Sequence, residues 1–432
     1  MSRADQLART ALLFQSDLGI DDTELVLHAL GAPKIVLTAG DAAMQTRAGQ
    51  VSLLTAAMLI ARSGQRVYIH ALDAPLIGYQ PPFTGRTLYE AIENIRGQLI
   101  DGNDIQVGFP MGADMAFVFG GESSTAPLQA KRTITVGWTA WSGEVNAWPR
   151  RSRFAERDWP IGALVAAVLV AAEAIKLSGA ALCRILGHKG HFAELFELNR
   201  GSRIHLAPDD TPKISNLGVI DIISAGAVSN GFLYTLLRLP DVVGEARVFD
   251  RDWSDQSNRN RNMLLIASLE HLTKAALFEH YGRGLRVDAI PRHFEARDLG
   301  GLSDQVAVGV DNVRTRWLLA QRRSMWMGVG ATSHFNSMSS VHYPYTACAA
   351  CLHPHDENVP GDTPTISFVS FLAGLFVAAD LLIEASGSKA FLAARQRYVT
   401  PLKTAGAFYG PVAPNPGCPA RCPVSQILRK SA

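Results

Sequence analysis

The residues that follow the hydrophobic segment 219–223 have the types and the order needed to hold a phosphorylated ligand. Gly226 stands in a turn of small residues before a predicted helix, where backbone N–H groups can face phosphate. Asp250 ends the next predicted strand, 24 positions after Gly226, near the spacing at which a carboxylate meets ribose hydroxyls. A strand, turn, helix and strand in this order predict a nucleotide pocket.

A polar run directly after this acid adds side chains that suit a triphosphate. It contains Asp252, Ser257, Asn258 and Arg261 within ten positions. Dinucleotide-dependent dehydrogenases share the strand–helix–strand unit, but they do not usually carry an aspartate followed by S-N-x-N-R. The arginine and the amide side chains therefore favour a nucleoside triphosphate such as ATP over a dinucleotide.

Two segments further along the chain extend the same chemistry. Lys274 lies on a predicted helix whose other face is apolar, so its ammonium group could reach a phosphate. Asp311 and Asn312 follow a predicted buried strand, and ligands gather at the carboxyl ends of strands in open α/β sheets. A carboxylate at that edge can bind the Mg²⁺ of a triphosphate. These two residues could also cap the helix that follows, and capping does not exclude metal binding.

Four cysteines near the end of the chain have the spacing of a zinc site. Cys348 and Cys351 form a C-x-x-C pair, and Cys418 and Cys422 form a looser second pair in a segment rich in proline and glycine. Four thiolates leave zinc no open position, so we expect a structural Zn²⁺. A redox C-x-x-C is the alternative, but it does not account for the second pair. Cys183 lies on an apolar run and is expected in the core.

The elements that position these residues repeat along the chain, which predicts an α/β fold with two tandem Rossmann-like domains. Residues 34–176 alternate predicted strands and helices, and the same order begins again near residue 220. Both copies end in an apolar helix that follows Trp-Pro or Thr-Pro, and each helix is expected to end at a Ser-Gly. We expect one domain over residues 1–205 and a second over 206–432, joined by a segment rich in proline and aspartate.

Composition narrows the class of protein. Hydrophobic residues make up 47% of the chain and charged residues 19%, which is enough for large cores. The net charge of +2 gives no reason to expect nucleic-acid binding or a polybasic membrane surface. The two apolar helices carry Glu173 and Asp380, so we expect buried core helices rather than membrane spans. A start without an apolar leader and paired cysteines favour a reducing, cytoplasmic location.

Taken together and in this order, these motifs resemble the ThiF/MoeB/HesA superfamily of ubiquitin-activating-enzyme-like adenylyltransferases. The resemblance covers residues 213–432 and implies ATP, Mg²⁺ and a structural Zn²⁺. It also implies a substrate, the C-terminal glycine carboxylate of a ubiquitin-like or sulfur-carrier protein, and in some members transfer to a conjugating enzyme. The implied roles are ribose binding for Asp250, phosphate binding for Asn258, Arg261 and Lys274, magnesium binding for Asp311, and zinc binding for the four cysteines.

The first domain resembles a degenerate copy. Asp41 follows its first strand where phosphate would approach, Asp73 stands at the ribose-like position, and no S-N-x-N-R or cysteine pair follows. This arrangement resembles the tandem inactive and active domains of eukaryotic activating enzymes, a pseudo-dimer within one chain that could also form a homodimer. Family members commonly take an arginine from the partner half into the ATP site, and Arg47 is the expected donor here.

The chain departs from the family pattern in two places. The glycine loop G-x-G-x-x-G reads S-A-G-A-V-S over 224–229, and serine fits its two outer positions if φ there stays below zero. The segment that carries the catalytic cysteine in relatives has no cysteine between residues 353 and 374. Either the enzyme only adenylates, or Ser367 replaces the thiol, with His353 or His355 as base. Ser367 as a helix cap is the alternative. Ser333-His334 is a second hydroxyl–imidazole pair, for which a loop without catalysis is the default interpretation.

Three further functions remain open. The adenylated substrate could be a small molecule or a peptide carboxylate. The chain could be a non-catalytic scaffold, since only one glycine of the phosphate loop is left. A dinucleotide oxidoreductase would not explain Arg261, Lys274 or the four cysteines.

Overall fold

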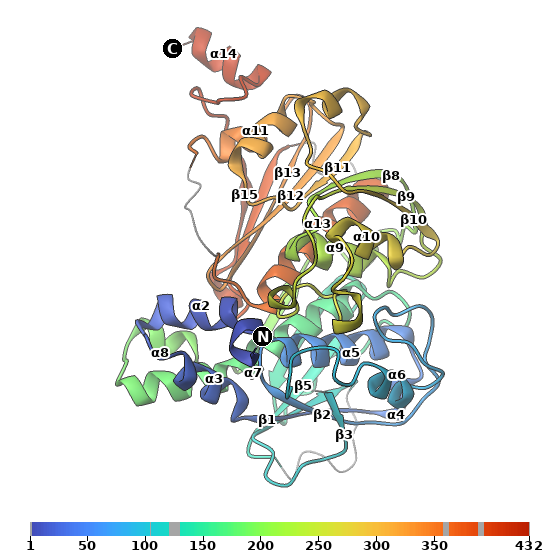
Figure 1. Cartoon of the computed structure of the whole chain (residues 1–432), viewed down its shortest axis with the longest axis vertical. Helices are drawn as coiled ribbons and strands as arrows, with labels where there is room; N and C mark the ends of the chain where they lie inside the picture. The colour runs from blue at the N-terminus through green and yellow to red at the C-terminus, as the bar shows by residue number, and fades with distance from the viewer. Residues whose placement is uncertain (1, 104, 121–129, 357–362, 388–392, 432) are drawn as a thin grey trace.

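The structure is a computed structural model, and it describes residues 2–103, 105–120, 130–356, 363–387 and 393–431. Two sheets organise the chain. The N-terminal sheet has the order β3-β2-β1-β4-β5-β6-β7, and the C-terminal sheet has the order β10-β9-β8-β11-β12-β13-β14-β15. In Figure 1 the blue-to-green N-terminal half lies below the yellow-to-red C-terminal half.

The strands of the N-terminal sheet are β1 (Lys34–Ala39), β2 (Arg66–His70), β3 (Ile105–Val107), β4 (Met115–Phe119), β5 (Thr133–Trp138), β6 (Ser142–Ala147) and β7 (Gly201–His205). Those of the C-terminal sheet are β8 (Asn216–Ile223), β9 (Val243–Phe249), β10 (Leu285–Ile290), β11 (Gln305–Val308), β12 (Trp326–Ser333), β13 (Asn336–His342), β14 (Arg395–Val399) and β15 (Phe408–Pro411). In each sheet the first five strands of the order pair in parallel and the remaining strands pair antiparallel. The expected α/β class with two Rossmann-like sheets is confirmed.

The helices of the N-terminal half are α1 (Arg3–Gln6), α2 (Ala8–Leu18), α3 (Thr23–Gly31), α4 (Asp41–Met44), α5 (Arg47–Arg62), α6 (Leu88–Asn94), α7 (Ile161–Leu186) and α8 (His191–Leu195). Those of the C-terminal half are α9 (Ala227–Leu236), α10 (Lys274–His280), α11 (Val313–Ala320), α12 (Ala349–Leu352), α13 (Ser367–Ala385) and α14 (Pro423–Ser431). The red helix α14 projects from the upper end of the molecule (Figure 1).

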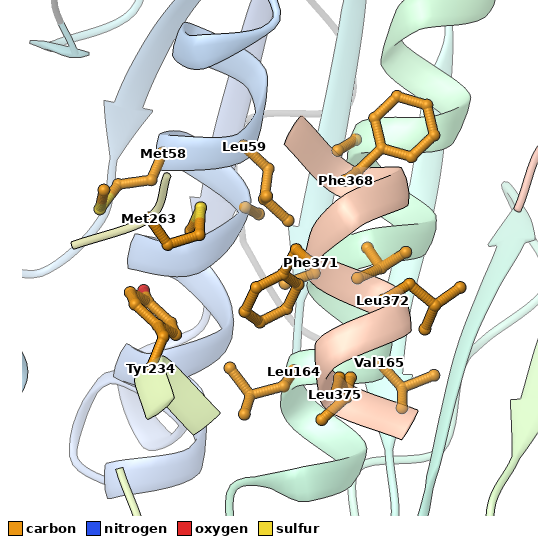
Figure 2. Close-up of a cluster of buried hydrophobic side chains, with 14 of the residues drawn as sticks. Met58, Leu59, Leu164, Val165, Tyr234, Met263, Phe368, Phe371, Leu372 and Leu375 are labelled. Carbon is orange, nitrogen blue, oxygen red and sulfur yellow. The ribbon is translucent and has the colours of Figure 1, made fainter. Parts of the chain in front are cut away.

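One hydrophobic core runs through both halves. Figure 2 shows where it crosses: Met58 and Leu59 of α5 and Leu164 of α7 lie beside Phe371 of α13 and Tyr234 of α9. The rings of Tyr234 and Phe371 meet edge to face at 5.4 Å between centroids. The Tyr234 hydroxyl lies 2.9 Å from the Thr55 hydroxyl of α5. The two halves are therefore joined by packed helices and buried hydrogen bonds.

The two long apolar helices are core helices of this body. Both α7 and α13 are long and apolar enough to cross a membrane, but 94% and 89% of their apolar windows are buried inside the molecule. The expected end of α7 at Ser178-Gly179 is wrong, because the helix continues to Leu186 and ends on Gly187 in the left-handed conformation. Gly179 instead allows a close contact, since a Cβ there would lie 2.2 Å from the ring of Phe196.

Candidate nucleotide site

A cavity of ≈ 360 Å³ lies at the carboxyl ends of β8, β9 and β11. Seven of the residues singled out from the sequence line it, and they come from four separate segments of the chain: Gly226, Asp250, Asp252, Asn258, Arg261, Lys274 and Asp311. The cavity thus brings three carboxylates together with basic side chains. This is the edge at which open α/β sheets bind their ligands.

Two N–H groups of the glycine loop are hydrogen-bonded within the protein. The Gly226 N–H donates to the Ser224 hydroxyl at 3.1 Å, and the Ala225 N–H donates to Asp250 Oδ2 at 2.7 Å. Ser224 has φ +75°, so the condition of a negative φ is not met at this serine. The turn from β8 into α9 keeps the left-handed conformation that a glycine would favour there. Ser229, at the other outer position, is buried within α9 as an ordinary helical residue.

Asp250 is anchored by the backbone on both of its carboxylate oxygens. Oδ2 accepts from Ala225, and Oδ1 accepts from the N–H of Asp252 at 2.8 Å. The orientation of this carboxylate is therefore set by the turn and not by a side-chain partner. A carboxylate held in this way is presented to the cavity in a fixed orientation.

Asp252 and Lys274 form an ion pair of 2.9 Å inside the cavity. The hydrogen bond from Lys274 lowers the pKa of Asp252. Lys274 opens α10, and the Thr273 hydroxyl caps that helix by accepting from the N–H of Ala276. The helix start thus places the ammonium group in the cavity, as the sequence predicted, but with a carboxylate partner that the sequence did not reveal.

The polar run after β9 divides its side chains between the cavity and the rest of the molecule. Asn258 and Arg261 line the cavity, and Arg261 donates to the carbonyl of Ser257 at 2.6 Å. Ser257 is not among the lining residues, and its N–H donates to Asp255 within a short 3₁₀ turn. The structure thus gives the main chain of Ser257 a local role in the turn, and its contact with a ligand stays a prediction.

The side chains of Asp311 and Asn312 have different roles in the structure. Asp311 lines the cavity, whereas the Asn312 side chain caps α11 by accepting from the N–H of Thr315 at 3.0 Å. Both also line an adjoining cavity of ≈ 200 Å³ that contains Phe249 and Phe294 and shares Ser224, Asp250, Asp252 and Asp311 with the first. The polar cavity thus opens beside a smaller one with aromatic walls.

An arginine of the N-terminal half also lines the cavity, and it is Arg9. This residue lies on α2, and its Nη1 donates to the carbonyl of Thr363 at 3.2 Å. Arg47 begins α5 and packs against Gly78 of its own half, so the expectation for Arg47 is wrong. No motif surrounds Arg9 in the sequence. Only the packing of the N-terminal helices on the second half brings it to the cavity.

Ser367 lies outside the cavity. The residue is 0% exposed at the start of α13, and its hydroxyl donates to the carbonyl of Leu59 at 2.8 Å and lies 2.9 Å from the Ser63 hydroxyl. These contacts join α13 to α5 of the other half. The geometry therefore contradicts a nucleophilic role for Ser367, since no acyl group can reach an oxygen enclosed in this way. Part of the preceding segment, 357–362, lies outside the described residues.

The second hydroxyl–imidazole pair is not a pair in the fold. The His334 imidazole contacts the carboxylate of Asp17 in the N-terminal half instead of Ser333. This contact, at the turn between β12 and β13, favours the interpretation of a loop without catalysis.

The four cysteines form one buried cluster. Their sulfur atoms all lie within 4.8 Å of one another, with 3.5 Å between Cys348 and Cys418 and 3.4 Å between Cys351 and Cys422. A tetrahedral zinc with Zn–S bonds of about 2.3 Å would hold its sulfurs about 3.8 Å apart. The arrangement fits a closed, four-thiolate site that ties α12 to the loop before α14. Cys183 is buried in the core, as expected.

At the corresponding edge of the N-terminal sheet, described segments of the chain contact one another. Asp41 begins α4, which packs so closely that a Cβ at Gly120, just after β4, would lie 2.6 Å from Ala43. The carboxylate of Asp73 accepts from the N–H of Tyr89 at 2.8 Å. Asp73 thus has a structural partner in its own half.

Comparison with known proteins gives one family match. The family described as the BilD N-terminal domain matches residues 34–183, which lie wholly in the N-terminal half. No curated protein sequence matches the chain. The match leaves out the cavity residues of the C-terminal half.

Several solved structures are distantly similar. They include E. coli MccB with MccA-N7isoASN (13% identity, TM-score 0.39, covering 47% of this chain and 67% of that one). Others are E. coli MccB with ATP (15%, 0.40, 48% and 67%) and PaaA (11%, 0.36, 45% and 64%). Likeness at this level carries no argument about function, so the case for a function rests on the residues of the cavity.

Proposed function

We propose that the C-terminal half binds ATP and adenylates the C-terminal carboxylate of a ubiquitin-like protein with an exposed terminal glycine. The observation that carries the proposal is the cavity itself. Residues from four separate segments line it, and they are residues to which the resemblance to adenylyltransferases assigns ATP or magnesium binding. In this proposal Asp250 binds the ribose, and the aromatic walls around Phe249 and Phe294 take the adenine.

The phosphates would lie among Lys274, Arg261 and Arg9, near the start of α9. Lys274 would give up its ion pair with Asp252 for a contact with phosphate. The Gly226 N–H would likewise give up its hydrogen bond to the Ser224 hydroxyl and donate to phosphate instead. Asp311 is the carboxylate that would hold Mg²⁺, which neutralises polyphosphate charge when bound. The incoming carboxylate attacks the α-phosphorus, its oxygen forms the new P–O bond, and pyrophosphate leaves. Positioning and charge neutralisation provide most of the rate, because the carboxylate is itself the nucleophile.

The geometry supports an enzyme that adenylates without an internal acyl intermediate on Ser367. The acyl group of the acyl-adenylate would pass directly to a thiol or amine of the next protein, such as a conjugating enzyme, and AMP would leave. The tandem chain would act as an internal pseudo-dimer, with a cytoplasmic location, and a further homodimer remains compatible with it. A structural Zn²⁺ in the four-cysteine cluster completes the proposal.

Pyrophosphate exchange tests the proposal. The wild-type chain is mixed with ATP, Mg²⁺, labelled pyrophosphate and candidate ubiquitin-like proteins, and it is compared with Asp311→Ala. The control is Asp288→Ala on β10, which removes an exposed carboxylate that pairs with Arg286 away from the cavity. We expect exchange that depends on the added protein, is lost in Asp311→Ala and is retained in Asp288→Ala. Exchange with a small or peptide carboxylate alone would select that substrate class instead.

A non-catalytic scaffold is the second candidate. It is favoured by the glycine loop, whose Gly226 and Ala225 N–H groups are already bonded within the protein. Calorimetry without detectable ATP binding, in a chain that retains its zinc, would establish the scaffold and refute the enzyme.

A further inference from the structure

A buried arginine of the N-terminal half holds the loop that presents Asn258 and Arg261 to the cavity. Arg62, the last residue of α5, is 0% exposed and makes no ion pair with a carboxylate among the described residues. Its guanidinium donates instead to carbonyls of the other half, at Arg259, Met263 (3.3 Å) and Leu265 (2.6 Å). One side chain thus spans seven consecutive residues of the loop 259–265.

Burying the guanidinium of Arg62 costs free energy. A guanidinium removed from water is costly unless its N–H groups are satisfied. Among the described residues, the three carbonyls accept from both Nη atoms of Arg62, whereas its Nε has no hydrogen-bond partner. The carbonyls belong to a segment outside regular helices and strands, so Arg62 is a main source of their hydrogen bonds. Burial lowers the pKa of Arg62 to about 9, which leaves the group protonated at neutral pH. Arg62 and the loop 259–265 are therefore held in one position relative to each other.

The side chains of the held loop point in two directions. Asn258, Arg261 and Asn262 line the cavity. Arg259 and Asn260 face the N-terminal half, where the Arg259 guanidinium donates to the carbonyl of Leu99 at 3.0 Å and the Asn260 amide lies 3.2 Å from the Thr10 hydroxyl. Alternate parts of the same S-N-R-N-R-N run thus serve the cavity and the contact between the halves.

We propose that Arg62 is a positioning residue of the ATP site, through which the N-terminal half fixes the geometry of the loop that binds phosphate. The inference rests on the proposed ATP binding of this cavity. It gives the N-terminal half two contributions to the second half: Arg9 enters the cavity directly, and Arg62 acts on it through the backbone of the loop.

Arg238 provides a matched control. It is also 0% exposed and lies just after the end of α9 at Leu236. It connects the halves by donating to the carbonyl of Pro81 at 2.6 Å. Its guanidinium stacks 3.1 Å from the centroid of Tyr234, and within the described part of the chain it makes no hydrogen bond or ion pair with the loop 259–265. Loss of Arg238 therefore disturbs the same interface without releasing the loop.

The experiment compares full-length wild type, Arg62→Met, Arg62→Lys and Arg238→Met. Calorimetry gives the Kd for ATP with Mg²⁺, and hydrogen–deuterium exchange gives the protection of residues 256–265 without nucleotide. We expect Arg62→Met to weaken ATP binding about tenfold or more, by loss of binding energy from the displaced loop. We expect Arg62→Lys to be intermediate, since an ammonium group can still donate to part of the carbonyl set.

Exchange should rise in residues 256–265 for Arg62→Met, whereas Arg238→Met should keep both the wild-type Kd and the protection of that loop. Equal effects of Arg62→Met and Arg238→Met, or a folded Arg62→Met with wild-type protection, would overturn the inference. If the wild type binds no ATP, the proposed function fails while the exchange comparison still decides whether Arg62 holds the loop. If Arg62→Met does not fold, Arg62→Lys decides the same question.

Discussion

Replacing Ser367 with alanine separates a catalytic hydroxyl from a structural one. The hydroxyl makes two buried contacts, with the carbonyl of Leu59 and with Ser63. The Leu59 carbonyl keeps the N–H of Ser63 at 3.1 Å and the hydroxyl of Ser63 at 2.8 Å as donors after the change. Since no buried acceptor is orphaned, the cost is that of a net hydrogen bond, about 1 kcal/mol.

This cost converts into a small change in melting temperature. The entropy of unfolding is about 2 cal/mol/K per residue, so a cooperative unit of this length would have about 0.9 kcal/mol/K. A loss of about 1 kcal/mol then lowers the melting temperature by about 1 °C. Phe371→Ala, at the same junction and 0% exposed, removes a core ring and should cost about 3–5 kcal/mol, or about 4 °C.

The assays are differential scanning calorimetry, pyrophosphate exchange and a search for a covalent adduct. We expect Ser367→Ala to keep the exchange rate of the wild type and the same adducts, with the small thermal shift. A hydroxylamine-labile, thiol-resistant adduct that forms in wild type and disappears in Ser367→Ala, with the melting temperature preserved, would refute the structural reasoning.

Three further predictions follow from the same structure. Arg9→Ala should raise the KM for ATP about tenfold with little change in stability, measured by pyrophosphate exchange, because Arg9 lines the cavity from outside the second half; an unchanged KM would count against it. Cys418→Ser should lower the bound zinc, measured by metal analysis, and destabilise the loop next to α14, whereas Cys183→Ser should leave zinc unchanged. Burial lowers the pKa of His342 from its usual 6.5 to about 4. As the pH falls, the unfolded chain therefore takes up this proton at a higher pH than the folded chain does. Stability should therefore fall by about 3 kcal/mol as the pH drops from 6.5 to 4, and His342→Gln should flatten this part of the curve in denaturant titrations.

Much of the cavity could be predicted from the sequence because parallel strands end at one edge of a sheet. Gly226, Asp250 and Asp311 each follow a buried strand, so the α/β pattern alone places them near one another. The cysteine spacing similarly predicts a cluster, since two thiols three or four positions apart can face one ion. The internal repetition of strand and helix patterns predicts two sheets of one topology.

What the sequence alone determined about this protein is the local order of strands, turns and polar residues within each half. The tertiary structure alone decided which side chains cross between the halves. Arg9 of α2 and Arg62 of α5 reach the second half, and Ser367 is enclosed against α5, because the N-terminal helices pack on that half. Periodicity encodes which face of a helix is apolar, but not which distant helix covers that face. For this reason the arginine near the cavity and the burial of the serine could be found only in the folded chain.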